Sequence, residues 1–250
     1  MTARAAASGL LLAGLAAGFA VGAPARALPP GRYGMELVTA TRAKVPVLGQ
    51  TKGASHNLLL VNIIDDGAGG LVQEHRPCAV AMRGAGSAAM VIPDAFLQAS
   101  GVKRYPIRVG PEGAYTADLG ADHVGYDPRR GALPTALTDA AVTDWDGDGR
   151  PAATIRLDLP VVGKVELYVV QHAHLTLSGA VAADGSVKGS VRFEAFAQRT
   201  LGASHKMFDA SPEMWPDPAA SSFWMAPVPA GTTCATLGSA LSAAVTRAAP

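Results

Sequence analysis

Apolar and polar residues alternate with a period close to two along most of the chain after residue 27, and helical periodicity is nearly absent there. Short runs rich in valine, isoleucine, threonine and aromatic residues are separated by glycine, proline and Asp-Gly turns, which is the pattern of β-strands. The strand signal is strongest in residues 153–162, 164–181 and 186–201. Weaker signals cover residues 32–42, 57–64, 71–75, 78–82, 88–93 and 105–110, and a short helix is expected at 94–100.

The turn between the two longest predicted strands is specific enough to predict their register. Residues 183–185 (Ala-Asp-Gly) suit a three-residue loop, in which a type I turn is followed by a glycine in the left-handed region. Ala182 then faces Ser186, and one face of the hairpin becomes apolar while the other becomes mostly polar. A shift by one residue would mix the two faces. The facing pairs expected from this register include Leu175 with Phe193, Leu177 with Val191, Ala173 with Ala195 and His174 with Glu194.

Long consecutive hairpins with few helices indicate an all-β fold. We expect an antiparallel β-barrel, with a β-sandwich as the alternative, because closure into a barrel removes exposed strand edges. The C-terminal part, residues 211–250, is expected to be irregular and to pack on the barrel. Its segment 211–231 contains five prolines and two tryptophans, and it is not predicted to form a central strand because proline cannot donate to the hydrogen-bond ladder. Residues 235–248 are expected to form a short helix or a disordered tail.

The first 27 residues have the features of a secretory signal peptide. Arg4 precedes an apolar stretch at 9–23 that is shorter than the roughly 20 residues needed to span a bilayer. Small residues at the −3 and −1 positions fit cleavage before Leu28, and an uncleaved membrane anchor is the competing interpretation. No other run in the sequence is long and apolar enough to span a membrane. We therefore expect export to the periplasm or the extracellular space, with residues 28–250 forming a single β domain.

Charge and cysteine content narrow the possible functions. Without the leader, 19 basic and 20 acidic residues remain, and this balance argues against a nucleic-acid-binding surface or a polybasic membrane patch. An exported chain with two cysteines favours one disulfide, between Cys78 and Cys234, with two buried free thiols as the alternative. Such a disulfide would tie the C-terminal segment to the first third of the chain.

Three acidic residues fall within five positions, at Asp144, Asp146 and Asp148, in a chain that has only 20 acidic residues. Alternating aspartates on a tight loop deliver side-chain oxygens to one centre, and oxygen is the ligand that calcium prefers. Gly149 allows the sharp bend at the sixth position of such a loop, and Arg150 would contribute its backbone carbonyl at the seventh. These residues therefore predict a calcium site, and an acidic turn without an ion is the alternative.

The aspartate loop resembles the calcium loops of EF-hand proteins over six residues and then departs from them. Ala152 stands at the ninth position and Ile155 at the twelfth, where an EF-hand has a bidentate glutamate. A strand-like sequence follows in place of the exiting helix, so a helix–loop–helix sensor is not expected. We expect a structural calcium loop, completed by water or by a carboxylate such as Asp139 or Asp158, with an affinity in the weak extracellular range of roughly 10⁻⁴ to 10⁻³ M.

The chain as a whole resembles secreted bacterial β-rich proteins that carry a single DxDGDG loop, a resemblance that implies no activity. Residues 31–37 (GRYGMEL) are similar to the Gly-x-Trp opening of lipocalin-like barrels, with Tyr33 in place of the tryptophan. No nucleophile elbow, phosphate-binding loop or dinucleotide fingerprint occurs in the sequence. The first functional hypothesis is therefore a non-catalytic exported barrel that binds a small apolar ligand or an envelope partner.

Two histidines in one predicted strand support a second hypothesis. His172 and His174 are two residues apart, so both project from one face, and the predicted register places Glu194 opposite His174. Such a group can bind zinc or another transition metal, whereas the simpler interpretation is the polar face of an amphipathic hairpin. An exported metal-dependent hydrolase using this face is therefore the alternative function. The acidic residues considered for its cleft are Asp118, Asp122 and Asp127.

Overall fold

The computed structural model describes residues 28–45, 49–83, 89–160 and 162–248, and the signal peptide predicted for residues 1–27 lies outside this part. Strands dominate, so the predicted all-β class is confirmed. None of the described helices has the length and apolar character needed to cross a bilayer. The strands are β1 (Gly31–Val45), β2 (Gly49–Asp65), β3 (Leu71–Arg83), β4 (Ala89–Val91), β5 (Lys103–Val109), β6 (Ala114–Val124), β7 (Ala153–Leu159), β8 (Gly163–Val181), β9 (Val187–Ala203), β10 (Glu213–Pro216) and β11 (Ser222–Pro227). The α-helices are α1 (Asp94–Ser100) and α2 (Leu237–Ala248), and short 3₁₀ turns lie at Pro111–Gly113, Lys206–Phe208 and Pro218–Ala220.

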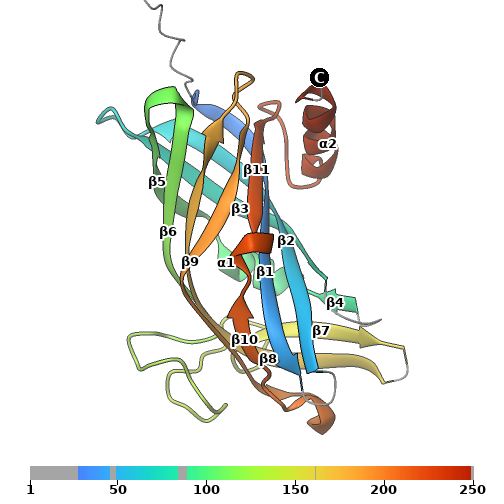
Figure 1. Cartoon of the computed structure of the whole chain (residues 1–250). Coiled ribbons are helices and arrows are strands. Elements are labelled where there is room, and N and C mark those ends of the chain that lie inside the picture. Colours follow the sequence, from blue (N-terminus) through green and yellow to red (C-terminus); the bar gives the residue numbers. More distant parts are fainter. Residues whose placement is uncertain (1–27, 46–48, 84–88, 161, 249–250) are drawn as a thin grey trace, which may run out of the picture.

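Eight of these strands close into a ring in which every neighbouring pair is antiparallel (Figure 1). The order around the ring is β1–β2–β3–β5–β6–β8–β9–β11, and β11 returns to β1. The expected antiparallel barrel is therefore present. Its ring is uneven, because strand length ranges from 6 residues in β11 to 19 residues in β8, and the long strands extend beyond the short ones.

Two long strands change partners along their length. β3 pairs with β5 near its start and with β4 near its end, and β8 pairs with β7 near its start and with β6 further along. β4 and β7 also pair with each other, so they continue the barrel wall where β5 and β6 stop. Helix α1 follows β4 in the chain and lies beside this change of partners, against β3. The aspartate loop lies where β8 passes from β6 to β7.

The main hydrophobic core fills the part of the barrel that contains β5 and β6. Tyr33, Met35 and Phe223 are almost inaccessible to solvent, with exposed fractions of 1%, 0% and 2%. Burial of this apolar area is the dominant favourable contribution to folding. The buried members of the core are Leu28, Tyr33, Met35, Leu37, Leu59, Val61, Ile63, Ile107, Tyr115, Ala117, Leu177, Val181, Val187, Val191, Phe223 and Met225.

The inner face of β1 and β2 becomes polar where these two long strands extend beyond the core. On β1, Thr39 and Thr41 follow Leu37 on the same side of the strand, and on β2 they face Ser55 and Gly53. All four residues beyond Leu37 are only partly buried. On β1 and β2 the inner face is therefore polar at this end and partly reached by solvent, whereas Met82 of β3, which faces Ser55, packs in an apolar cluster with Met90 and Ile155.

The C-terminal segment contradicts one expectation. β11 lies between β1 and β9 in the sheet, with Phe223 and Met225 in the core. The expectation that residues 211–231 are irregular and form no central strand is therefore wrong. The prolines do not interrupt the ladder inside these strands, because Pro227 is the last residue of β11 and Pro216 the last residue of β10.

The end of the chain does pack on the outside of the barrel, as expected. Helix α2 confirms the short helix considered for this region, and it covers β1 and β2 (Figure 1). Leu237 and Leu241 are 0% and 6% exposed and pack in one cluster with Leu60. Both leucines lie directly over Gly34, where any larger residue would collide with them.

The predicted disulfide is also present. It joins Cys78 of β3 to Cys234, in the segment that precedes α2, and the two Cα atoms are 5.0 Å apart. The cysteines are separated by 156 positions in the sequence. The disulfide therefore fastens the C-terminal helix to the barrel wall.

The turn of the β8–β9 hairpin has the predicted form. The Ala182 N–H donates to the Ser186 carbonyl at 2.7 Å, and Gly185 has a φ of +78°, as the three-residue loop requires. Leu175 faces Phe193 as predicted. The local turn chemistry therefore sets the register over the first part of the hairpin.

The predicted register fails further from the turn. An extra residue in β9 shifts the pairing, so that His174 faces Ala195 and Ala173 faces Phe196. The predicted pairs of His174 with Glu194 and of Ala173 with Ala195 are therefore wrong. A second irregularity follows at Tyr168. Bulges of this kind bend a strand and increase its twist, which suits long strands that wrap around a barrel.

Candidate metal site

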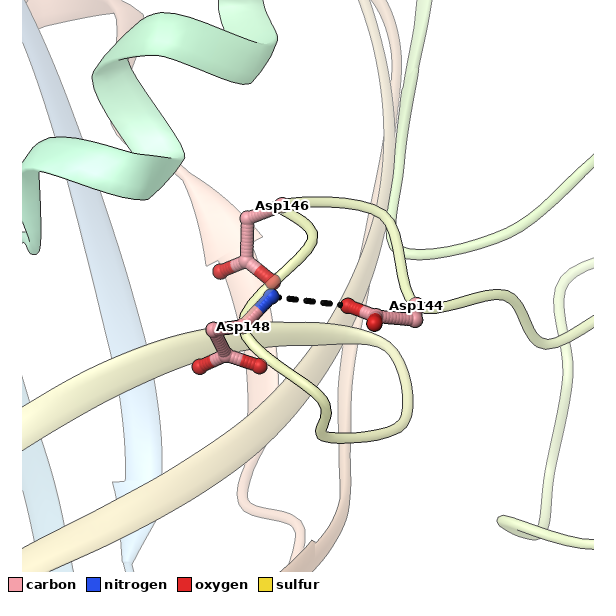
Figure 2. A group of neighbouring side chains, drawn as sticks. All are labelled: Asp144, Asp146 and Asp148. Atoms are coloured by element: carbon pink, nitrogen blue, oxygen red, sulfur yellow. Dashed lines mark hydrogen bonds between the residues drawn. The ribbon is translucent and has the colours of Figure 1, made fainter.

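β6 and β7 pair with the same edge of β8, and the end of β6 lies close to the start of β7 along that edge. Val124, the last residue of β6, faces Gln171, and Ala153, the first residue of β7, faces Val169. Residues 125–152 therefore form a long excursion that returns to β8 close to the point where it left. The three aspartates lie in the last part of this excursion, immediately before β7 (Figure 2).

The first part of the excursion covers the outer face of β8. Tyr126 and Ala141 are 5% and 0% exposed, and they pack with Tyr168 and Val170 of β8 in a small apolar cluster. This packing holds the excursion against the barrel wall. The aspartate loop therefore starts from a fixed base.

Backbone hydrogen bonds close the base of the aspartate loop. The Trp145 N–H donates to the Ala152 carbonyl at 3.1 Å, and the Ala152 N–H donates to the Thr143 carbonyl at 2.8 Å. Gly147 and Gly149 have φ values of +68° and +81°, which glycine adopts without strain. Ala152 is held in the same region, at φ +67°, although its Cβ makes this conformation unfavourable. The chain therefore reverses sharply between the aspartates and is fixed at both ends.

Trp145, between the first two aspartates, attaches the loop to the barrel. Its ring packs edge-to-face on Phe96 of α1, with ring centroids 5.0 Å apart. Val124 and Ile155, from the end of β6 and from β7, belong to the same apolar cluster. Trp145 thus packs where the barrel wall passes from β6 to β7.

The three aspartates converge as the sequence predicts (Figure 2). One oxygen from each carboxylate lies within 4.8 Å of the others. Asp144 accepts hydrogen bonds from the N–H groups of Asp148 (3.1 Å) and Gly149 (3.0 Å), and Asp148 accepts one from the Arg150 N–H (2.8 Å). The loop therefore brings three carboxylates together, an arrangement that can hold a metal ion.

Asp146 is the buried member of the group, with only 8% of its surface exposed. Its Oδ2 accepts the Thr154 N–H at 2.9 Å, whereas its Oδ1 is buried and has no hydrogen-bond partner within the described chain. Burial raises the pKa of the Asp146 carboxyl, and the nearby charges of Asp148 and Asp144 raise it further. An unpaired buried carboxylate oxygen is unfavourable, and a cation beside the three carboxylates would satisfy it.

The other predicted ligands lie apart from this group. Asp139 accepts the Ala141 N–H at 2.9 Å, and Asp158 lies within β7, so neither belongs to the group of three. The Arg150 guanidinium Nε lies 3.4 Å from the Glu166 carboxylate. The side chains gathered at the site are therefore the three aspartates.

An asparagine at position 146 tests the effect of the buried charge. With a chelator present, we expect Asp146→Asn to be at least as stable as the wild type at pH 7, because asparagine keeps an oxygen for the Thr154 N–H and carries no charge. Folding raises the pKa of Asp146, so the folded wild type binds this proton more tightly than the unfolded chain, and it gains stability as the pH falls through the raised pKa. The advantage of the variant should therefore shrink between about pH 7 and pH 4. Urea unfolding at several pH values measures it, and parallel pH profiles would contradict this account.

The second predicted metal group is not assembled. The His174 Nε2 and the Asp118 Oδ1 are 2.6 Å apart, and the His172 ring stacks on His123 with centroids 4.7 Å apart. Glu194 instead accepts hydrogen bonds from the Arg192 Nε at 2.6 Å and from the Thr176 Oγ1 at 3.0 Å. His172, His174 and Glu194 therefore do not form a metal-binding group among the described residues.

The acidic residues proposed for a hydrolase cleft are also separated. Asp118 faces Thr176 on the outer face of the barrel, whereas Asp122 faces the buried Ala173 on the inner face. Asp122 accepts a hydrogen bond from the Lys103 Nζ at 2.6 Å. Asp127 binds the Arg129 guanidinium at 2.9 Å, which lowers the pKa of its carboxyl to about 2. Each of these three carboxylates is thus engaged in its own contact.

The contact between His123 and His172 could not be predicted from the sequence alone. The two residues become neighbours only through the β6–β8 register, in which they face each other directly. The available signal was His172 itself. It lies in a strongly predicted strand, and the strand that pairs with it on the side away from β9 could not be assigned from the sequence. The partner could be identified only once β6 was placed.

No family model, curated protein or solved structure matches the chain. The resemblances to single-loop secreted proteins and to lipocalin-like barrels therefore rest on the residues quoted for them.

Proposed function

We propose that the protein is an exported, non-catalytic β-barrel domain whose aspartate loop binds one calcium ion as a structural element. The observation that carries the proposal is the Asp146 Oδ1, which is buried without a hydrogen-bond partner next to oxygens of Asp144 and Asp148. Three carboxylates in one turn repel one another unless a cation balances their charge.

The chemistry of the site favours calcium over other cations. All three side chains offer oxygen, whereas zinc and copper prefer nitrogen and sulfur ligands. Magnesium requires a nearly regular octahedron, while calcium accepts irregular sets of six to eight oxygens. The aspartates supply three side-chain ligands on a bent loop, and backbone carbonyls such as that of Arg150 and water would supply the rest. Such a site would have the weak affinity of extracellular calcium modules, roughly 10⁻⁴ to 10⁻³ M.

The position of the loop supports a structural role. The second oxygen of Asp146 accepts the Thr154 N–H, in the strand that continues the barrel wall. Trp145 connects the same loop to Phe96 of α1. An ion that draws the aspartates together would hold the start of β7 and the position of α1 at the same time.

Other features favour export and binding at the outer surface. A disulfide is typical of oxidising compartments, in agreement with the predicted leader and with export to the periplasm or the extracellular space. The core residues Tyr33, Met35 and Phe223 occupy the space in which an internal apolar ligand would lie. We therefore place the interaction with an envelope component on the outside of the barrel rather than in its core.

Calcium is expected to stabilise the wild type and to have no such effect on Asp146→Asn. At about 10 mM calcium, binding to the folded state alone should raise the free energy of unfolding by roughly 1.4 to 2.7 kcal/mol. The measurement is urea unfolding of chelator-treated full-length protein with and without calcium.

The matched control for this experiment is Asp94→Asn, which removes an exposed carboxylate from α1. It should keep the full response to calcium. An equal response of the Asp94 and Asp146 variants, or a wild type that does not respond, would overturn the calcium proposal. A zinc-dependent hydrolytic activity of the purified protein would instead overturn the non-catalytic part.

A further inference from the structure

Three histidines share the outer face of β6 and β8. His172 and His174 are two residues apart on β8 and project from the same side, and His123 on β6 directly faces His172. Leu175 and Leu177 point to the opposite side of β8 from these histidines. Leu177 belongs to the main core, and Leu175 packs against it. The three imidazoles are therefore on the outside of the barrel, on two hydrogen-bonded strands.

His123 and His172 are already in contact. Their rings stack with centroids 4.7 Å apart and an interplanar angle of 13°, and Tyr126 packs edge-on against His123 at 5.5 Å. Both histidines are partly buried. The packing therefore holds the two rings side by side on the outer wall, and a neutral imidazole is a ligand for transition-metal ions.

His174 has a carboxylate partner of the kind that orients metal-binding histidines. Its Nε2 lies 2.6 Å from the Asp118 Oδ1, and the same oxygen accepts the Gly120 N–H at 2.8 Å. Asp118 is therefore fixed by the backbone as well. A carboxylate on one ring nitrogen sets the tautomer and makes the other nitrogen a better ligand.

We propose that His123, His172 and His174 bind one divalent transition-metal ion, such as zinc, on the outer wall of the barrel, and that Asp118 acts as a positioning residue for His174. Imidazole nitrogens suit zinc, copper and nickel, so the site differs in chemistry from the oxygen-only aspartate loop. The ring nitrogens are not gathered as the aspartate oxygens are. Metal binding therefore includes rotation of these partly exposed side chains, which is rapid at a protein surface.

Calorimetric titration of the full chain with zinc chloride, after treatment with a chelator, tests the proposal. We expect one zinc ion per chain. His123→Ala and His172→Ala should each weaken binding by at least about tenfold, because even residues that only orient a ligand contribute roughly 10- to 100-fold to metal affinity. Asp118→Asn should weaken binding within that range while leaving the stoichiometry unchanged.

The matched control is His56→Ala, which removes another histidine of the sheet that contacts a carboxylate, with its Nδ1 3.0 Å from Glu36. It should bind zinc as the wild type does. If it loses as much affinity as His123→Ala, the site lies elsewhere. Loss of zinc binding in Asp146→Asn, or its displacement by excess calcium, would assign the zinc to the aspartate loop and overturn the proposal.

A second measurement does not depend on the folding of any variant. The chain has six histidines, and their imidazole signals can be followed by NMR while zinc is added to the wild type. The signals of His123, His172 and His174 should shift together up to one equivalent. Shifts confined to other histidines, or no shifts at all, would overturn the proposal.

Discussion

Replacing Cys78 and Cys234 together by alanine is expected to lower the free energy of unfolding by about 5 kcal/mol. The disulfide links residues 156 positions apart, so its loss greatly increases the conformational freedom of the unfolded chain. Little packing is lost, because Cys234 is exposed. Urea unfolding under non-reducing conditions measures the difference.

The control for this experiment is the same comparison with a reductant present, where wild type and variant should converge. The variant should also release α2 from the barrel more often, because Leu237 and Leu241 would be the main remaining contacts of that helix. Limited proteolysis before α2 reports this release. A loss below about 1 kcal/mol would show that the unfolded chain is already constrained near these positions.

Gly125→Ala is expected to lower the free energy of unfolding by about 2 to 6 kcal/mol. Gly125 has a φ of +80°, and an added Cβ would overlap the Val169 carbonyl oxygen and lie 3.1 Å from the Ala153 nitrogen. Backbone strain accounts for roughly 1 to 3 kcal/mol, and overpacking accounts for a similar amount. The residue lies where β8 passes from β6 to β7, so neither strand can move away without losing its pairing.

Gly67→Ala separates these two contributions. Gly67 has a similar φ of +78°, but an added Cβ there meets nothing within 4 Å. Its variant should therefore show only the loss that comes from strain. Equal losses in the two variants, measured by thermal or urea unfolding, would show that the close approach at Gly125 contributes nothing.

Features that depend on local backbone chemistry could be predicted from the sequence. The alternation of apolar and polar residues identified most of the strands, because burial on one face of a strand repeats every second residue. Residues 183–185 were enough to predict the turn, because glycine is the residue best suited to the left-handed conformation at its last position. The spacing of Asp144, Asp146 and Asp148 was enough to predict that their carboxylates converge.

Features that depend on long-range packing could not be predicted. The extra residue in β9, near Glu194, does not change the alternation of apolar and polar residues in β8. The partners predicted for His174 and Ala173 were therefore wrong by one position. His123 became a neighbour of His172 only through the pairing of β6 with β8. The burial of Asp146 arises from the tertiary arrangement of the loop, which includes the contact between Trp145 and Phe96.

The C-terminal strands show a different limit. Their prolines were counted without regard to position, although a proline at the last residue of a strand leaves the preceding hydrogen bonds intact. Pro216 and Pro227 occupy such positions, and Phe223 and Met225 alternate with Trp224 as in any half-buried strand. The alternation could be recognised in the sequence, whereas the residues at which the two strands end could not. Only those end positions show that Pro216 and Pro227 are compatible with the strands.

The place of β11 between β1 and β9 has a consequence for the order of events during synthesis. The barrel can close only after residues 222–227 have been made, so β1 and β9 keep an unpaired edge until then. Closure also pairs segments that are far apart in the chain, which slows folding. We expect the growing chain to remain open and prone to association for most of its synthesis, and to reach its protected form only near its completion.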